Sequence, residues 1–147
     1  CVTNSHTWAH TYVSNMSEGQ ILQSFNQTRD AFVAAGGNAP KGVRPPGGKI
    51  NDASKAVLAK AGMPSIVWSV DTLDWKTRNA QKTIDTVLSQ VKDGDIVLMH
   101  DLYEQSAIAA ETLIPELTKR GYQLVTVSEM AELRGGMAAG HSYGHFR

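Results

Sequence analysis

Cysteine is nearly absent from this sequence, since Cys1 is the single cysteine among 147 residues. One cysteine excludes an internal disulfide framework and any zinc site built from several thiolates. Long apolar runs are absent as well, because no stretch approaches the roughly 20 consecutive apolar residues of a membrane-spanning helix. The sequence therefore predicts no membrane span in this chain.

An excess of charge of one sign is also missing, because fourteen lysines and arginines balance fourteen aspartates and glutamates. Proteins that bind nucleic acids gather basic side chains to neutralise phosphates, so this balance indicates no nucleic-acid partner. An uncharged or mixed-charge substrate fits the composition better. Hydrophobic residues make up 41% of the chain, which favours an ordered globular domain with a real core.

Apolar runs alternate with helical patterns along most of the chain. The spacing predicts helices at about residues 17–35, 51–61, 79–91 and 106–120. Buried strands are predicted at about residues 65–70, 96–99 and 122–126. Such alternation is typical of βα units around a parallel sheet or barrel, so we expect an α/β fold.

Local signals refine this outline. Ser17, followed by Gln20 three residues later, predicts a capping box at the start of the first helix. Pro115 should kink the fourth helix or split it in two, because proline lacks the backbone N–H that a helix interior requires. Residues 134–147 are rich in Gly, Ala, Ser and His, and we expect them to form a loose C-terminal tail.

Polar residues recur at the points where predicted strands end. A short strand leads to Arg44, residues 71–75 follow the strand at 65–70, and His100 follows the strand at 96–99. In α/β barrels the loops after the carboxyl ends of the strands build the active site. The sequence therefore predicts that several polar groups lie at one mouth.

His6 and His10 are four residues apart, a spacing that places both imidazoles on one side of a helical turn. Two such nitrogens can bind one zinc ion. The alternative is a pair of unrelated surface histidines. A metalloprotease His-Glu-x-x-His motif is disfavoured, because Thr7 occupies the position of its general base.

Arg44 begins the run Arg-Pro-Pro-Gly-Gly, in which Pro46 is followed directly by Gly47. The prolines restrict the backbone and the glycines let it approach a ligand closely, which predicts a rigid platform beside a fixed cation. A plain tight turn is the competing interpretation.

Residues 71–75 carry the carboxylates Asp71 and Asp74 and the indole of Trp75. Acids in a loop are often helix caps or solvated groups, and that interpretation stays open here. His100 ends a strongly apolar strand, where a neighbouring carboxylate would hold its tautomer and make it an effective general acid. A hydrogen-bonded core histidine is the alternative.

Taken in order, these four features resemble the NodB homology domain of the carbohydrate esterase family 4 polysaccharide deacetylases. The resemblance covers nearly the whole chain, including the Gly-Tyr segment at 121–126 and the Arg-Gly-Gly segment at 134–136. It implies a distorted, incomplete (β/α) barrel in which residues 1–147 form the catalytic domain.

The resemblance also implies roles. His6 and His10 correspond to two histidine ligands of a zinc ion, which another divalent metal such as cobalt could replace. Arg44 corresponds to the arginine that orients the catalytic aspartate, Asp74 to the carboxylate that tunes the catalytic histidine, and His100 to the general acid. The residues implied for the substrate groove and acetyl pocket are Pro46, Gly47, Trp75 and Leu98.

The sequence departs from the family in two places. The first motif of the family, close to Thr-Phe-Asp-Asp-Gly-Pro, supplies the general base and the third zinc ligand, and no Asp-Asp pair occurs in this chain. We therefore expect an N-terminal fragment of the same protein to carry that motif together with the missing first strand or strands. The second departure is Gly47, where many relatives have a tyrosine.

The implied activity is zinc-dependent hydrolysis of N-acetyl groups on a polysaccharide that contains N-acetylglucosamine, with peptidoglycan as the first expected substrate. The expected location is extracellular or at the cell surface. Chitin or exopolysaccharide, and then acetylated xylan, are alternative substrates. A glycan-binding protein without catalysis and a metal-binding structural protein are the rival functions.

Overall fold

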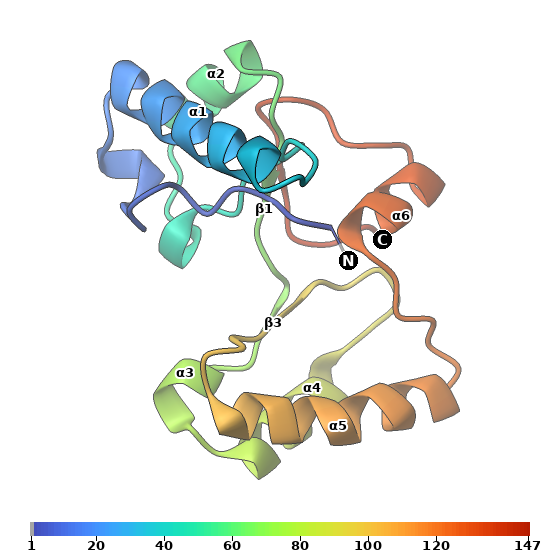
Figure 1. Ribbon diagram of the computed structural model, residues 1–147. Coiled ribbons are helices and arrows are strands. Elements are labelled where there is room, and N and C mark those ends of the chain that lie inside the picture. Colours follow the sequence, from blue (N-terminus) through green and yellow to red (C-terminus); the bar gives the residue numbers. More distant parts are fainter. Residues whose placement is uncertain (1) are drawn as a thin grey trace. The chain divides into compact units, whose positions relative to one another are not determined.

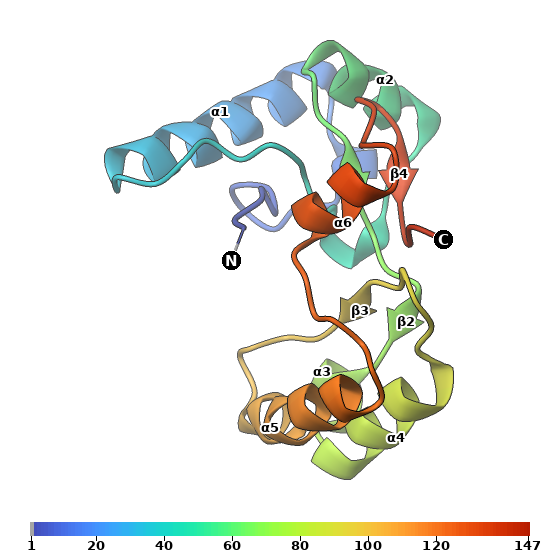
Figure 2. The ribbon, with the colours of Figure 1, turned by 90° about the vertical axis from the view of Figure 1, so that its right-hand side faces the viewer.

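The computed structural model describes residues 2–147 (Figures 1 and 2). The chain divides into two compact units. Unit 1 consists of Cys1–Val67 and Gly135–Tyr143, and unit 2 consists of Trp68–Arg134 and Gly144–Arg147. Among the described helices, none is long and apolar enough to cross a membrane.

Unit 1 combines helices with short parallel strands. Its elements are η1 (Val13–Asn15), α1 (Glu18–Ala34), η2 (Pro46–Gly48), α2 (Asp52–Lys60), β1 (Ser65–Ile66) and β4 (Ser142–Tyr143). β1 and β4 pair in parallel, with Ser65 opposite Ser142. Single parallel bridges join Val43 to Ser5 on one side and to Ser65 on the other. Four chain segments therefore form a short parallel ladder.

Side-chain hydrogen bonds cap the N-termini of the two long helices of unit 1, α1 and α2. The Ser17 hydroxyl accepts a bond from the Gln20 N–H, and the Gln20 side chain accepts one from the Ser17 N–H at 2.8 Å. This capping box was predicted and is confirmed. Asn51 and Ser54 form a second one at α2. The core packed between these elements contains Val13, Ile21, Phe25, Val43, Val57 and Leu58.

Unit 2, like unit 1, combines helices with short parallel strands. They are β2 (Val70–Asp71), α3 (Asp74–Thr77), α4 (Ala80–Gln90), β3 (Val97–Leu98), α5 (Glu104–Lys119) and α6 (Val127–Leu133). β2 and β3 pair in parallel, with Asp71 opposite Leu98. Helices α4 and α5 lie side by side (Figure 2). Their apolar faces form a core of Val70, Ile84, Val87, Ala109, Leu113 and Leu117.

Three expectations about secondary structure were wrong. The run expected as one strand at 65–70 is interrupted, because β1 ends at Ile66 and β2 begins at Val70. Helix α5 continues through Pro115 and is not split in two, and the buried side chains Leu113 and Leu117 on either side of it fix the helix against α4. Tertiary packing thus offsets the hydrogen bond that proline removes.

The third wrong expectation is the strand at 122–126, where the described residues form no strand. The Tyr122 N–H bonds to the Leu117 carbonyl at the end of α5, and the Tyr122 hydroxyl donates to the Val91 carbonyl. Thr126 then caps α6 by accepting a bond from the Glu129 N–H. The backbone N–H groups at the two ends of the segment, those of Tyr122 and Thr126, thus bond to residues of the adjoining helices.

The C-terminal segment is not the loose tail that its composition predicted. β4 pairs with β1 inside unit 1. Phe146 is 5% exposed, and its N–H donates to the Gly94 carbonyl at 2.7 Å. A Cβ at Gly94 would lie 2.3 Å from the Phe146 carbonyl oxygen, so this contact requires glycine. Apolar side chains within the glycine-rich sequence therefore order the segment.

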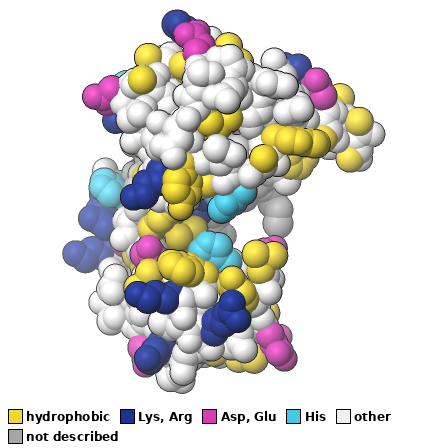
Figure 3. Space-filling view, turned by 90° about the vertical axis from the view of Figure 1, so that its left-hand side faces the viewer, with side chains coloured by type: hydrophobic (Ala, Val, Ile, Leu, Met, Phe, Trp, Pro, Cys, Tyr) yellow, Lys and Arg dark blue, Asp and Glu magenta, His cyan; other side chains and the backbone are white. Residues whose placement is uncertain are grey.

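Side chains of both charge signs lie on the surface (Figure 3). On the face shown in Figure 3, basic and acidic side chains are scattered among uncharged ones. This distribution matches the charge balance of the sequence.

Candidate active site

His6 and His10 are both exposed, and their ring centroids are 4.9 Å apart with an angle of 64° between the ring planes. The Nδ1 atom of His6 lies 2.6 Å from the Arg44 carbonyl oxygen. A carbonyl oxygen can only accept, so Nδ1 carries the hydrogen and Nε2 keeps a lone pair. In this tautomer Nε2 is the nitrogen of His6 that can act as a metal ligand.

The two rings meet through a loop and not through the helical turn that their spacing predicted. Thr7 and His10 have φ angles of 62° and 55°, in the left-handed region that residues with a Cβ seldom adopt. The Trp8 N–H donates to the Ser24 hydroxyl of α1 at 2.7 Å, which helps to hold this conformation. The helical-turn prediction was therefore wrong, although the expected pairing of the imidazoles is present.

The imidazoles of His6 and His10 can form part of a metal site. Imidazole nitrogen suits zinc and cobalt, and zinc in enzymes is bound by three protein ligands and a water molecule. Among residues 2–147, no group of three or more His, Cys, Asp or Glu side chains is arranged to hold a metal ion. His6 and His10 can thus supply two of three ligands.

Arg44 is partly buried in unit 1, and burial lowers the pKa of its guanidinium from the usual value. Its backbone N–H donates to the Ser5 carbonyl at 2.8 Å, while its carbonyl holds His6. Arg44 is therefore anchored by its main chain to the ladder that also begins the histidine loop.

The residues after Arg44 form a tight turn, and their role as a platform for a ligand stays a prediction. Pro46 is buried, and the Gly48 N–H donates to the Pro45 carbonyl at 2.9 Å. Gly47 has a φ angle of 59°, and a Cβ added there would lie 3.2 Å from the ring of Tyr12. The ring of Tyr12, a residue 35 positions earlier in the chain whose exposed fraction is 44%, thus lies against Gly47.

Asp74 and His100 form a hydrogen-bonded pair in unit 2. His100 Nδ1 lies 2.8 Å from Asp74 Oδ1, and the His100 backbone N–H donates to Asp74 Oδ2 at 2.6 Å. The Ser106 hydroxyl donates to the same Oδ2 at 2.7 Å. Asp74 is 2% exposed, whereas the His100 side chain is 35% exposed. The carboxylate is thus enclosed while its partner reaches solvent.

The surroundings keep Asp74 ionised. Burial by itself raises the pKa of this carboxyl group. Hydrogen bonds from the Ser106 hydroxyl, the His100 ring and the backbone N–H groups of His100 and Trp75 more than offset it, so the pKa is lowered. An ionised carboxylate only accepts, so His100 Nδ1 carries the hydrogen, and Nε2 is the nitrogen left to exchange a proton.

The parallel pairing of β2 and β3 brings this pair together. Asp74 begins α3 just after β2, and His100 follows β3 by two residues. The buried Thr72 hydroxyl donates to the Leu98 carbonyl at 2.7 Å and links the two chain segments. The carboxyl ends of neighbouring parallel strands therefore present the two side chains to each other, as the sequence predicted.

The predicted groove residues of this unit differ in exposure. Trp75 is 48% exposed, so its indole is open to a ligand. The Leu98 side chain is 7% exposed and contributes mainly packing. The roles of both in substrate binding stay predictions.

Known proteins are similar to this chain in sequence and in fold. The polysaccharide deacetylase family model matches residues 1–66. The chain is 40% identical over 130 residues to the peptidoglycan-N-acetylmuramic acid deacetylase PdaC of Bacillus subtilis, covering 88% of this chain and 27% of PdaC. It is 38% identical over 126 residues to the peptidoglycan-N-acetylglucosamine deacetylase PgdA of Listeria monocytogenes, covering 86% of this chain and 26% of PgdA.

A solved structure, the T48 deacetylase with substrate, superposes with a TM-score of 0.89 at 33% identity, covering 97% of this chain and 69% of that one. The chain belongs to the polysaccharide deacetylase family. This result confirms the family and the α/β fold of the incomplete (β/α)-barrel type expected from the sequence. The chain spans about a quarter of the length of PdaC and PgdA.

Sequence reasoning missed two buried hydroxyl groups near the Asp74–His100 pair, those of Ser106 and Thr72. Ser106 lies three residues before Ala109 and seven before Leu113, on the buried face of α5. A hydroxyl on a buried helix face requires a hydrogen-bond partner, and Asp74 provides it. That pattern was a signal from which Ser106 could have been found.

Proposed function

We propose that this chain carries part of the catalytic machinery of a zinc-dependent deacetylase that removes N-acetyl groups from N-acetylglucosamine in peptidoglycan. The observation that supports this most directly is the buried, ionised Asp74 bonded at 2.8 Å to the exposed His100. The names of the relatives PdaC and PgdA support peptidoglycan as the substrate.

His100 acts as the general acid in this proposal. Asp74 holds the Nδ1–H tautomer of His100, so Nε2 is the nitrogen that can deliver a proton to the departing amine. Ser106 and the His100 backbone N–H hold the carboxylate in place and are positioning groups. The acid is thus oriented before the substrate binds.

His6 and His10 would hold the zinc ion, for which cobalt is an alternative. A bound metal ion supplies polarisation of the amide carbonyl and a lower pKa for the attacking water. Arg44 would orient the aspartate that removes the proton from this water, and a backbone N–H near Gly47 would stabilise the oxyanion. The family resemblance assigns both sets of residues to one reaction.

The general base and third metal ligand are proposed to come from an N-terminal fragment of the same protein that carries the Asp-Asp motif. The 147 residues contain no Asp-Asp pair, and the described residues offer no third ligand. Zinc with two protein ligands would be under-coordinated for an enzyme. Activity should therefore require both parts.

The substrate class and location follow from the relatives. N-acetylmuramic acid is the substrate named for PdaC and N-acetylglucosamine the one named for PgdA, and we propose the latter here. Chitin, exopolysaccharide and xylan remain alternatives. Peptidoglycan lies outside the membrane, so an extracellular or cell-surface location is part of the proposal.

A glycan-binding protein without catalysis is the second candidate function, favoured by the absence of an Asp-Asp pair from the 147 residues.

The test measures acetate release from peptidoglycan and N-acetylglucosamine oligomers, with zinc content determined in the same samples. We expect acetate release when the chain is joined to a segment that carries the Asp-Asp motif, and loss of release in a His100→Ala variant of that protein. Mass spectrometry must show that the 147-residue chain is free of other polypeptides. If this chain alone releases acetate at a normal enzymatic rate, the proposal that the general base lies on an N-terminal fragment is wrong. Glycan binding without any acetate release would support the second candidate.

A further inference from the structure

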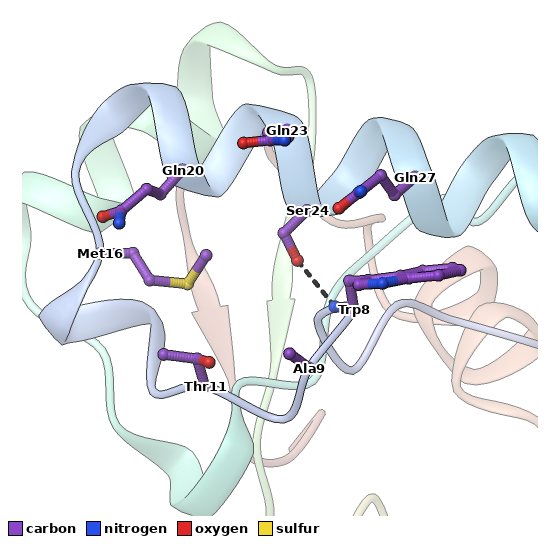
Figure 4. Close-up of a pocket in the computed structure, with 8 residues that line it drawn as sticks. All are labelled: Trp8, Ala9, Thr11, Met16, Gln20, Gln23, Ser24 and Gln27. Atoms are coloured by element: carbon purple, nitrogen blue, oxygen red, sulfur yellow. Dashed lines mark hydrogen bonds between the residues drawn. The ribbon is translucent and has the colours of Figure 1, made fainter.

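Unit 1 contains a cavity of about 200 Å³ between the histidine loop and α1 (Figure 4). Every side chain that lines it is uncharged. The lining residues are Trp8, Ala9, Thr11, Met16, Gln20, Gln23, Ser24 and Gln27. A ligand recognised through ion pairs therefore does not fit this cavity, whereas a neutral polar ligand does.

Three glutamines of α1 form one side of the cavity, because Gln20, Gln23 and Gln27 lie on the same face of the helix (Figure 4). The Gln20 side-chain oxygen already caps the helix through Ser17. Within residues 2–147, the side chains of Gln23 and Gln27 have no hydrogen-bond partner. Each amide can therefore donate to and accept from the hydroxyl or amide groups of a ligand.

Trp8 supplies the apolar surface of the cavity. Its backbone is fixed by the hydrogen bond to Ser24 at 2.7 Å, while its side chain is 56% exposed. A large exposed ring on a fixed backbone offers contact area to a ligand at a low cost in conformational entropy. Pyranose rings present a face of C–H groups with hydroxyl groups around the edge, which complements an indole flanked by amides.

We infer that this cavity is a glycan subsite, which binds an uncharged, N-acetylated pyranose unit of the same polysaccharide strand. The inference rests on the proposed function, because Trp8 lies in the loop between His6 and His10. A strand that has one unit at the histidines can continue to the next unit at Trp8. The lining has no carboxylate for the ammonium of a deacetylated sugar, so the subsite prefers units that still carry the acetyl group.

The experiment measures the binding of N-acetylglucosamine disaccharide and hexasaccharide, and of the glucosamine hexasaccharide, to the metal-free protein. Indole N–H resonances are followed by NMR, and the Trp8 signal is assigned from a Trp8→Phe variant. We expect the N-acetylated hexasaccharide to shift the Trp8 signal and to bind more tightly than the other two ligands. Gln27→Ala should weaken its affinity about fivefold, the loss of one hydrogen bond of about 1 kcal/mol.

Matched variants separate the subsite from general effects. Asn26→Ala removes an exposed amide from α1 outside the cavity and should leave the affinity unchanged. Trp8→Ala should weaken binding more than Trp8→Phe, which keeps an aromatic face. If Trp8→Ala perturbs the histidine loop, the Gln23→Ala and Gln27→Ala variants on the exposed surface of α1 decide whether the cavity binds the hexasaccharide.

The subsite is refuted if the hexasaccharide does not bind, or if it binds with the same affinity to Trp8→Ala and Gln27→Ala. It is also refuted if the glucosamine hexasaccharide binds equally well. These outcomes are distinct from failure of the proposed function, which is an absence of acetate release from the protein with the Asp-Asp motif. A shifted Trp8 signal without acetate release would keep the subsite and reject the deacetylase.

Discussion

Replacing Asp74 by Asn tests the central feature of the proposed mechanism, the carboxylate that fixes His100. The substitution preserves the shape of the side chain but replaces one acceptor oxygen by an NH₂ group. Asp74 accepts bonds from the His100 ring at Oδ1 and from the His100 backbone and Ser106 at Oδ2. The new NH₂ group must therefore face either the two donors at Oδ2 or the His100 ring, which then has to change its tautomer to accept. Because Asp74 is 2% exposed, water cannot relieve this conflict.

The expected loss in the free energy of unfolding follows from these contacts. A hydrogen bond to a charged group contributes about 1.5 to 3 kcal/mol, and an unsatisfied buried donor costs about 1 to 3 kcal/mol. We therefore expect Asp74→Asn to lower the free energy of unfolding at neutral pH by about 2 to 4 kcal/mol. The His100 tautomer is no longer fixed, so kcat should fall by about 10² to 10⁴, the range for general acid catalysis.

The sign of the pH dependence is also determined. The folded-state pKa of Asp74 is lowered below its usual value near 3.9, so the ionised carboxylate stabilises the folded state above that pH. This stabilisation is lost as the pH falls through the lowered pKa. The difference in unfolding free energy between the parent protein and the Asp74→Asn variant should therefore be largest near neutral pH and shrink in acid.

The assays are denaturant unfolding at several pH values and acetate release by the active protein. Asp101→Asn is the control, because it removes an exposed carboxylate next to His100 in sequence. The control should leave both stability and kcat within a small factor of the parent. Equal stability of Asp74→Asn at neutral pH, or an unchanged kcat and pH profile, would refute the assigned role.

Further substitutions test other parts of the structure. His6→Ala and His10→Ala should each remove most of the zinc affinity, and full zinc occupancy of the double variant in elemental analysis would reject that site. Ser106→Ala should raise the pKa of the buried carboxylate and shift the pH profile of kcat, and Ser106→Thr, which keeps the hydroxyl, should restore the profile. Gly47→Ala should lower the free energy of unfolding by about 1 to 2 kcal/mol, because φ is 59° and a tyrosine ring lies 3.2 Å from the new Cβ. Gly19→Ala, at a helix position with no atom within 4 Å of the new Cβ, should instead stabilise the protein in thermal unfolding.

The sequence determined the features that depend on neighbours within a few residues. Ser17 caps α1 as predicted, and Asn79 caps α4 in the same way, because each side chain bonds to a backbone N–H three residues later. The meeting of Asp74 and His100 was also predictable, since both follow apolar strands and parallel strands end at one edge. The order of these motifs along the chain was enough to identify the family.

Only the tertiary structure decided features that depend on contacts distant in sequence. The spacing of His6 and His10 suggested a helical turn, but the bonds from Trp8 to Ser24 and from His6 to the Arg44 carbonyl hold a loop instead. Helix α5 passes through Pro115 because its buried face packs against α4. No local pattern reports such contacts, since their energy comes from groups brought together by folding.

Ser106 shows the same division within one residue. Its place on the buried face of α5 could be read from the period of the helix, and so could the need for a partner. The identity of that partner, a carboxylate 32 residues earlier, depends on how α5 packs in unit 2. The sequence by itself thus determined which chemical groups are available. Folding decided which of them lie about 3 Å from one another, because hydrogen bonds act only over that distance.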